Sequence, residues 1–346
     1  MHLVTGGSGY VGSFIAHELL RRGESVRVVD LLDPVLQHPR LAFHKLDVLD
    51  AAGLRAAMTG VEYVHHTAAL VPLRKAGARF WEVNVRGTEN VLTAAREAGV
   101  KHFSHMGSSA VFGAHTKTDC PITESTRRQP IEIYGRSKLA GEDLVLQENE
   151  RHGGMTCSII RPRTIVGTER LGIFQVLFEW LSEGRAIYII GDGSNVFQFV
   201  HIDDIVAVSV ESALKRTPGI FNIGTDRYGT LREALENLSR HAATGSRIRG
   251  LPVAPSMAAL WALDHMGLCP LAPWHYRTYH KDFYFDLKKP FRELSWRPKY
   301  SNDEMLAISY DWYMKNKKKI DAESSTGSAH RSRISQRALG LLKRLS

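Results

Sequence analysis

The sequence predicts an α/β fold: a doubly wound parallel sheet with a smaller C-terminal lobe that closes over a substrate. Three observations predict it. Short β-branched segments alternate with amphipathic helical segments through the first half of the chain, a glycine-rich stretch follows the first predicted strand, and the alternation loosens beyond Arg161. Strands separated by helices form parallel sheets that helices cover on both faces.

The expected elements follow one another from the N-terminus. The strands of the first half are His2–Thr5, Ser25–Asp30, Leu41–Leu46, Val61–Thr67, Lys101–Met106 and Met155–Arg161. The helices between them are Tyr10–Arg22, Ala51–Met58, Phe80–Ala98 and Ile131–Glu150. Beyond them we expect a helix at Leu171–Ser182, a strand pair formed by Ile187–Ile190 and Val196–His201, and helices at Asp203–Leu214, Leu231–His241, Ser256–Met266 and Asp303–Met314.

The glycines after the first strand form a motif with a physical role. Residues 5–12 read TGGSGYVG and satisfy both GxGxxG and TGxxGxxG. Such glycines allow a tight turn and let the backbone approach a pyrophosphate, which then faces the N-terminus of the next helix. Asp30 ends the second strand about 20 residues later, where a carboxylate accepts hydrogen bonds from the adenosine ribose. The motif predicts dinucleotide binding, and Asp30 favours NAD because it would repel the 2′-phosphate of NADP.

Further motifs then appear in a characteristic order. They are Asp47-Val48, the HTAA stretch 66–69, the NVRGT stretch 84–88, the SSAVFG stretch 108–113, the YGRSK stretch 134–138, Arg161-Pro162, the GDG stretch 191–193, the VHIDD stretch 200–204 and the FNIG stretch 221–224. As an ordered set they resemble the extended short-chain dehydrogenase/reductase family from the N-terminus to about Met314. The resemblance implies a Rossmann fold and an enzyme of the NAD-dependent epimerase/dehydratase type.

The resemblance also implies the site residues. The catalytic residues would be Ser108, Tyr134 and Lys138. The residues that contact NAD would be Gly6, Gly9, Tyr10, Val11, Gly12, Asp30, Asp47, Val48, Thr67, Ala68, Ala69, Asn84, Tyr134, Lys138, Pro162, Thr164 and Ile165.

Position along the chain separates this YxxxK from two other matches. Tyr284 with Lys288 and Tyr313 with Lys317 have the same spacing, but no strand end or serine loop precedes them. Tyr134 and Lys138 lie four residues apart and share a helix face. We expect the ammonium to lower the pKa of the tyrosine, and Ser108 to donate a hydrogen bond to the substrate oxygen as hydride moves to or from the nicotinamide.

The substrate motifs leave two alternatives. Relatives that act on nucleotide sugars commonly carry an arginine before the DFVHVDD stretch and often an asparagine after RP, but here Phe197 and the Arg163-Thr164 pair stand at those positions. The aromatic, apolar stretch 251–285 is similar to the 3β-hydroxysteroid dehydrogenase branch. Arg163, Arg170 and Arg277 remain candidate phosphate ligands. The sequence thus favours an epimerase or dehydratase on a nucleotide sugar, with a steroid-type dehydrogenase as the alternative and a non-catalytic NAD sensor as the third reading.

Composition excludes other classes of function. The chain of 346 residues carries a net charge of +9, but nine Lys and Arg and only two acidic residues lie in 315–346, so the body is nearly neutral. Nucleic-acid binding is disfavoured because its footprint belongs on a folded face. The histidine pairs His65-His66 and His102/His105 do not point toward a common metal position, so we expect no metal. Three distant cysteines without a CxxC pair indicate neither a zinc site nor a disulfide framework.

These observations define the expected organisation. Residues 1–165 form the NAD-binding domain, its sheet completed by parts of 185–225, and residues 166–314 form mainly the substrate lobe. Residues 315–346 form a basic, flexible tail. The sequence favours a solvated tail, and weak contact of its amphipathic end, 334–345, with an anionic membrane surface is the alternative. The N-terminus shows no secretory signal, so we expect a cytoplasmic protein. The family resemblance implies a homodimer.

Overall fold

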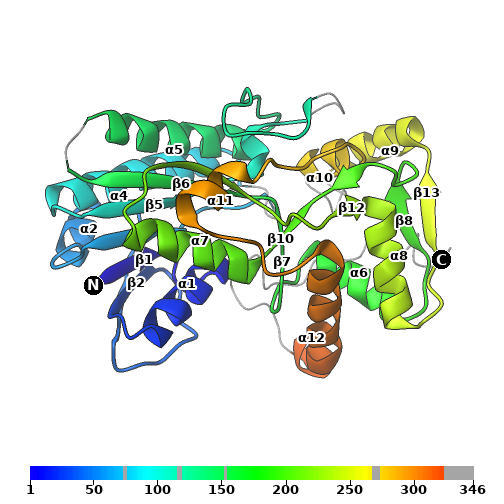
Figure 1. The fold of residues 1–346 in the computed structure, drawn as a ribbon, viewed down its shortest axis with the longest axis horizontal. Helices are drawn as coiled ribbons and strands as arrows, with labels where there is room; N and C mark the ends of the chain where they lie inside the picture. Colours follow the sequence, from blue (N-terminus) through cyan, green and yellow to red (C-terminus); the bar gives the residue numbers. More distant parts are fainter. Residues whose placement is uncertain (73–75, 115–118, 152–153, 267–272, 323–346) are drawn as a thin grey trace.

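The computed structural model describes residues 1–72, 76–114, 119–151, 154–266 and 273–322. Its central sheet consists of β1 (His2–Thr5), β2 (Val26–Asp30), β3 (Leu41–Lys45), β4 (Tyr63–His66), β5 (His102–Met106), β6 (Thr156–Pro162) and β11 (Gly219–Ile223). The strands lie in the order β11-β6-β5-β4-β1-β2-β3, and all neighbours are parallel (Figure 1). The predicted doubly wound fold is confirmed.

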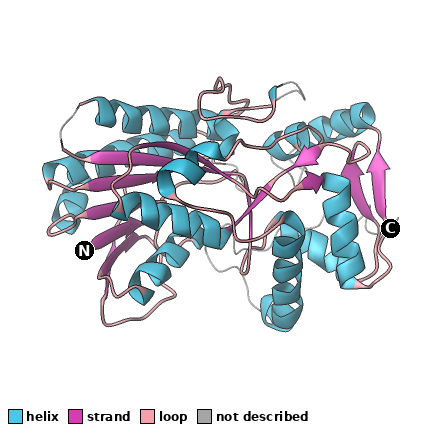
Figure 2. Ribbon diagram, viewed as in Figure 1, coloured by secondary structure: helices cyan, strands magenta, loops and turns pink. Residues whose placement is uncertain are grey.

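Helices cover both faces of this sheet (Figure 2). One face packs against α2 (Ala51–Ala57), α4 (Gly87–Glu97) and α5 (Ile133–Glu150), and the other packs against α1 (Tyr10–Arg21) and α7 (Ile202–Leu214). Each face has its own apolar core, which explains why β1 is buried at every position. Strands covered on both sides need apolar residues on both faces rather than an alternating pattern.

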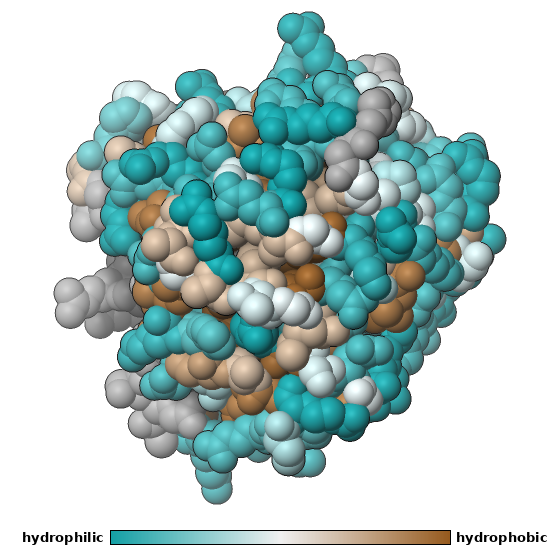
Figure 3. Space-filling view, turned by 90° about the vertical axis from the view of Figure 1, so that its left-hand side faces the viewer, coloured by the Kyte–Doolittle hydropathy of each residue, from teal (hydrophilic) through white to brown (hydrophobic). Residues whose placement is uncertain are grey.

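β1 pairs with β2 on one side and with β4 on the other. The strand order therefore reverses between β1 and β4. Ligands of such sheets bind outside the carboxyl ends of the strands at this reversal. In Figure 1 these ends face the middle of the molecule, toward the C-terminal lobe. Figure 3 looks onto the opposite end, where the strands begin, and shows hydrophilic side chains interspersed with smaller apolar areas.

One predicted helix is divided into three segments. The expected helix Phe80–Ala98 consists of a single turn, α3 (Arg79–Trp81), a π-helical turn, η1 (Glu82–Arg86), and α4. A π-helical turn holds one more residue than an α-helical turn and is frequent at functional sites.

The C-terminal lobe has two small sheets of its own. Its elements are α6 (Ile173–Ser182), β8 (Ile187–Ile190), β9 (Val196–Phe197), β12 (Gly229–Thr230), α8 (Leu231–Ala242), β13 (Ile248–Leu251), α9 (Val253–His265), α10 (Pro273–Thr278) and α12 (Asn302–Ala322). The predicted pairing of Ile187–Ile190 with Val196–His201 is wrong. Instead β8 pairs with β13 and β9 with β12, while β10 (Phe199–His201) pairs with β7 (Thr164–Val166). These partners are distant in sequence, so local pattern does not specify them.

The chain passes between the two parts more than once. After the lobe elements α6, β8 and β9, it returns to the sheet with α7 and the edge strand β11. The helix α11 (Lys288–Leu294) also packs on the sheet side, where Leu294 joins the apolar cluster that contains Phe221 of β11.

The last described helix corrects the predicted start of the tail. We expected the helix to end at Met314 and a flexible tail to begin at Lys315, but α12 continues to Ala322. Ile320 is buried in the lobe core, and the Lys317 ammonium donates a hydrogen bond to Ser182 Oγ at 2.9 Å. These contacts with α6 hold the added turns in place. The rest of the expected tail, with its amphipathic segment 334–345, lies outside the described residues. Within the described chain, no helix combines the length and apolarity needed to cross a membrane.

Candidate active site

The glycine loop connects β1 to α1 and is closed by its own backbone. Gly6 has a φ of +68°, a conformation that disfavours any residue with a Cβ, and a Cβ there would lie 2.7 Å from Ala68 Cα. Gly9 is the N-cap of α1 and donates its N–H to the Gly6 carbonyl at 3.0 Å. A Cβ on Gly12 would lie 2.2 Å from that carbonyl oxygen. Only glycines allow the loop to fold this tightly. Without side chains there, the loop backbone lies open to a pyrophosphate.

Tyr10 and Val11 are the first two residues of α1, where backbone N–H groups have no acceptor within the helix. Their amides face the loop and favour an anion there. The Tyr10 side chain does not point to that space, because it is buried and its hydroxyl donates to the Thr168 carbonyl at 3.0 Å. Its contribution to a cofactor site is therefore that of its backbone.

Asp30, at the end of β2, lies against the same loop. One carboxylate oxygen accepts the Ser8 N–H at 3.0 Å and the other accepts the Leu32 N–H at 3.0 Å. These bonds orient the carboxylate and leave further lone pairs free, since an ionised carboxylate accepts about four hydrogen bonds. Asp30 is only partly buried, so those lone pairs are open to a ribose hydroxyl.

The segments after β3 and β4 surround this loop. The Thr67 hydroxyl donates to the Thr5 carbonyl at 2.7 Å and so ties the end of β4 to β1, while Ala68 and Ala69 follow at partly exposed positions. Asp47 accepts the Leu49 N–H at 3.0 Å, and Val48 is buried against Gly87.

Asn84 is held by protein groups, and its contact with the cofactor stays a prediction. Its side chain is buried, accepts the Leu70 N–H at 2.8 Å, and donates to the Leu70 carbonyl at 3.1 Å and to Ser137 Oγ at 3.0 Å. Both ends of the amide are therefore bound to protein. Asn84 positions the chain after β4 against α5, next to Lys138.

Ser108 and Tyr134 come together at the carboxyl end of β5. Ser108 is the N-cap of a short 3₁₀ turn, η2 (Ser109–Val111), and accepts the Ala110 N–H at 3.2 Å. Tyr134 lies in the first turn of α5, and the Ser108 side chain is close enough to act on its pKa. Burial raises the pKa of Tyr134 to about 12, although Ser108 opposes the rise.

Lys138 lies one turn further along α5 and is buried. Its ammonium donates to the Met106 carbonyl at 2.5 Å and lies 3.4 Å from His105 Nε2. Burial lowers the pKa of Lys138 to about 8, and the nearby Glu142 carboxylate acts in the opposite direction. The expectation that Lys138 lowers the pKa of Tyr134 is wrong for this arrangement, because desolvation of the tyrosine dominates and the ammonium is directed at the strand end.

The predicted contacts after β6 lie at the junction with the lobe. Pro162 is buried at the end of β6, and Thr164 and Ile165 begin β7. Thr164 hydrogen-bonds to the Tyr279 hydroxyl, and Ile165 packs with the cores beneath α1 and α7. This segment therefore joins the sheet to the residues 273–285 of the lobe.

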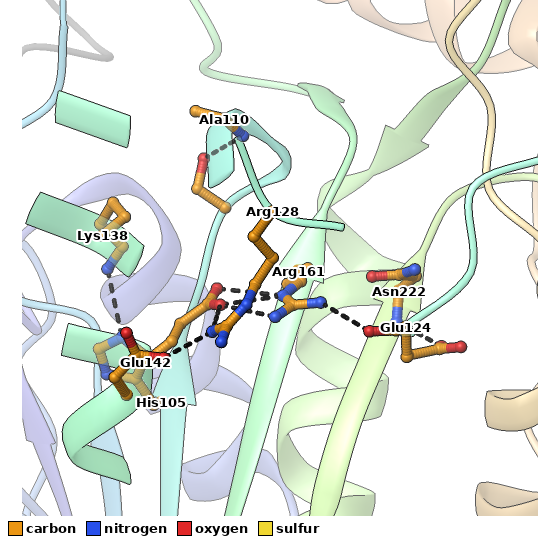
Figure 4. A network of polar contacts seen from close by, with 10 residues as sticks. His105, Ala110, Glu124, Arg128, Lys138, Glu142, Arg161 and Asn222 are labelled. Atoms are coloured by element: carbon orange, nitrogen blue, oxygen red, sulfur yellow. Dashed lines mark hydrogen bonds and ion pairs between the residues drawn. The ribbon is translucent and has the colours of Figure 1, made fainter. Parts of the chain in front are cut away.

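A network of charged side chains connects to α5 (Figure 4). The Arg161 guanidinium binds the Glu142 carboxylate with Nη2–Oε2 at 2.7 Å and Nε–Oε2 at 3.0 Å, and both side chains are fully buried. Arg161 also reaches the Glu124 carbonyl at 3.5 Å, while Glu124 Oε1 accepts the Asn222 N–H of β11 at 3.0 Å. The network thus connects α5, β6 and β11.

Sequence reasoning did not assign a role to two further residues at this site. Glu132, two residues before Tyr134, accepts the Trp274 N–H, and burial raises its pKa to about 7. Glu142 lies one turn beyond Lys138. The helical spacing from Lys138 to Glu142 was a usable signal. Glu132 had none, since its partner is 142 residues away in the chain.

Two other features lie outside the site. A cavity of about 920 Å³ in the lobe is lined by residues of 191–195, 250–253 and 280–282 together with Arg232, and it contains none of the expected catalytic residues. Within the described part of the chain, no three His, Cys, Asp or Glu side chains lie close enough together to bind a metal ion.

Comparison with known proteins agrees with this geometry. A family model described as "NAD dependent epimerase/dehydratase family" matches residues 2–224. The uncharacterized protein y4nG of Sinorhizobium fredii is 40% identical over 340 residues, which are 98% of this chain and 85% of that protein. A 3 beta-hydroxysteroid dehydrogenase/Delta 5-->4-isomerase of Mycobacterium tuberculosis is 29% identical over 353 residues, covering 94% and 95%.

Solved structures are similar over almost the whole chain. DesIV, a dTDP-glucose 4,6-dehydratase of Streptomyces venezuelae solved with NAD bound, has a TM-score of 0.73 and 28% identity, and the match covers 92% of this chain and 98% of that one. The glycine loop, the Asp30 carboxylate and the family match lead to one conclusion. The chain belongs to the NAD-dependent epimerase/dehydratase family of extended short-chain dehydrogenases/reductases.

Proposed function

We propose that the protein is an NAD-dependent dehydrogenase or reductase that transfers hydride at a secondary alcohol or ketone, with Ser108, Tyr134 and Lys138 as its catalytic residues. The observation that carries the proposal is the position of the Ser108 side chain beside Tyr134, close enough to act on the pKa of the tyrosine. It places two hydroxyl groups side by side at the carboxyl end of β5, close to the strand-order reversal where a dinucleotide binds.

Each residue has a task in this reaction. Bound NAD would supply the hydride acceptor. When a ketone is reduced, the Tyr134 hydroxyl would donate its proton to the substrate oxygen; when an alcohol is oxidised, the Tyr134 phenolate would accept the alcohol proton. Ser108 would hold the substrate oxygen by a hydrogen bond in both directions. Lys138, protonated below its pKa of about 8, would bind the nicotinamide ribose through its ammonium and so orient the cofactor.

We propose NAD rather than NADP as the cofactor. Asp30 presents an oriented carboxylate at the end of β2, and its two backbone hydrogen bonds hold it in place. A carboxylate there favours a free ribose hydroxyl and repels a phosphate.

The proposed substrate is an apolar alcohol or ketone. Phe197 stands where nucleotide-sugar relatives carry an arginine, and it packs with Phe199 and Tyr279. Trp274, Phe283 and Phe285 extend this aromatic wall. The similarity to the mycobacterial steroid dehydrogenase over almost the whole chain supports the same substrate class. The similarity to the nucleotide-sugar enzyme DesIV supports a second candidate, a redox-neutral epimerase or dehydratase that regenerates its bound NAD.

One assay separates the two candidates. The protein is incubated with NAD and panels of 3β-hydroxysteroids and of nucleotide sugars, while NADH absorbance and product mass are recorded. The dehydrogenase accumulates NADH with an apolar alcohol. The redox-neutral enzyme converts a nucleotide sugar with no lasting NADH.

The catalytic role proposed for Ser108, Tyr134 and Lys138 is tested by Tyr134→Phe. Loss of the proton-transfer group should lower kcat by about 10²–10⁴-fold and leave NAD affinity unchanged. Tyr284→Phe is the matched control, because Tyr284 has the same YxxxK spacing but stacks on Tyr228, away from Ser108. Unchanged turnover in Tyr134→Phe would refute the assignment, and NAD binding without turnover on either panel would favour the sensor.

A further inference from the structure

Arg163 is a buried cation enclosed by aromatic rings. The residue lies between β6 and β7 and is 3% exposed. The carbon at the centre of its guanidinium lies 4.0 Å from the Phe283 ring centroid, 4.8 Å from that of Phe197 and 5.9 Å from that of Phe285. Cation–π contact stabilises the charge but satisfies none of its N–H donors.

One edge of this guanidinium has no hydrogen-bond partner. Nε and Nη2 of Arg163 are buried and neither donates to any atom of the described chain. No carboxylate of the described residues forms an ion pair with it. Burial lowers the pKa of Arg163 to about 9, because the charge is desolvated without an acidic partner. An unpaired buried charge is costly, so a protein retains one chiefly where a ligand completes it.

Arg161, two residues earlier, shows what this edge binds. Its own Nε and Nη2 both donate to the Glu142 carboxylate, at 3.0 and 2.7 Å. The planar guanidinium presents these two N–H groups in parallel, and they match the two oxygens of a carboxylate. The two arginines thus differ in one respect: the fork of Arg161 is occupied by a protein carboxylate, and the fork of Arg163 is not.

The three rings that enclose Arg163 favour a carboxylate over a diphosphate. The rings of Phe197, Phe283 and Phe285 offer no hydrogen-bond donor to additional charged oxygens. A diphosphate carries at least two charges and needs several donors, whereas one carboxylate is matched by one guanidinium fork. Aromatic walls also suit the apolar body of a ligand.

We propose that the Nε–Nη2 edge of Arg163 binds a carboxylate of the substrate, which is then an apolar alcohol or ketone that also carries an acid group. The identification of this ligand as the substrate rests on the proposed function. The carboxylate site itself is tested by binding, without turnover.

The experiment follows the Nε–H signals of the arginines by ¹⁵N NMR. The Arg163 signal is assigned by its loss in Arg163→Lys. Benzoate is titrated into the full-length protein to about 50 mM, and benzamide, which has the same shape without the charge, is titrated in parallel. We expect benzoate to shift the Arg163 signal saturably and benzamide to leave it in place. The Arg161 signal is an internal control and should not move, because Glu142 already occupies that fork.

Two variants complete the test. Arg163→Lys should weaken benzoate binding at least about tenfold, since an ammonium lacks the parallel fork. Arg247→Lys, at an exposed position of the lobe, should bind benzoate as the unmodified protein does. An Arg163 signal unmoved by benzoate overturns the proposal. A shift produced by UDP and not by benzoate also overturns it, because the fork would then serve a phosphate.

NAD binding, measured by fluorescence on the same samples, separates this proposal from the proposed function. If the protein binds NAD but gives no benzoate shift, the carboxylate site is refuted and the proposed function stands. If the protein gives the shift but binds no NAD, the carboxylate site is supported and the proposed function is refuted.

Discussion

Glu142→Gln removes the negative charge from the buried network that joins α5 to β6. The substitution keeps the size of the side chain but leaves the Arg161 guanidinium, which is fully buried, without a carboxylate. The remaining contacts of Arg161 are a carbonyl oxygen of Glu124 at 3.5 Å and the ring of Phe112 at 5.0 Å. Arg128 does not replace the lost charge, since it is itself a cation near Glu142.

The expected loss of stability is large. Breaking one side of a buried ion pair costs about 3–5 kcal/mol. With an unfolding entropy of about 2.1 cal/mol/K per residue, a chain of 346 residues should lose about 4–7 °C in Tm. Differential scanning calorimetry measures this change. The double variant Glu142→Leu with Arg161→Met should recover most of it, because apolar residues of similar volume replace a buried pair at little cost.

The same substitution acts on catalysis through Lys138. Glu142 is the charge that raises the pKa of Lys138 against the effect of burial. Without it that pKa falls further below about 8, so the ammonium is lost at lower pH and the alkaline limb of the pH–rate profile moves to lower pH. A Tm loss below about 1 °C together with an unshifted alkaline limb would refute this account of the network.

Three further predictions concern the cofactor and the last helix. Gly12→Ala should raise the Kd for NAD at least about tenfold, because its Cβ would collide with the Gly6 carbonyl and open the loop; fluorescence titration gives the Kd, and unchanged affinity would place the pyrophosphate elsewhere. Asp30→Asn should raise the ratio of NADP to NAD in kcat/KM by about tenfold or more, and steady-state kinetics with both cofactors would expose an unchanged ratio. Ile320→Ala should cost about 2–5 kcal/mol of stability while the exposed Lys318→Ala costs little; equal Tm values in calorimetry would mean that α12 does not pack beyond Met314.

The cofactor half of the protein follows from local pattern. The turn at Gly6–Gly12 and the position of Asp30 depend on residues within a single βαβ unit, so spacing alone predicts that they meet. The position of Ser108 beside Tyr134 also follows. Ser108 comes after the carboxyl end of β5, and Tyr134 lies in the first turn of α5 at the same edge of the sheet.

The rest depends on contacts between distant segments. The aromatic surroundings of Arg163 come from Phe197 and from 283–285, which the sequence separates by more than 80 residues. The pairing of β8 with β13 joins Ile187 to Ile248, which lie 61 residues apart in the chain. The motif around Asn84 shows the residue type but not that Leu70 and Ser137 bind its amide.

The position of Asn84 depends on the number of residues in the π-helical turn η1. The turn contains one residue more than a regular helix needs, and Asn84 lies at its centre. Deletion of a single residue before Asn84 would restore regular winding and rotate its amide by about 100° around the helix axis. The bonds to Leu70 and Ser137 would then break together. The extra residue of this turn therefore joins the chain after β4 to α5, so the length of the turn is constrained together with the identity of Asn84.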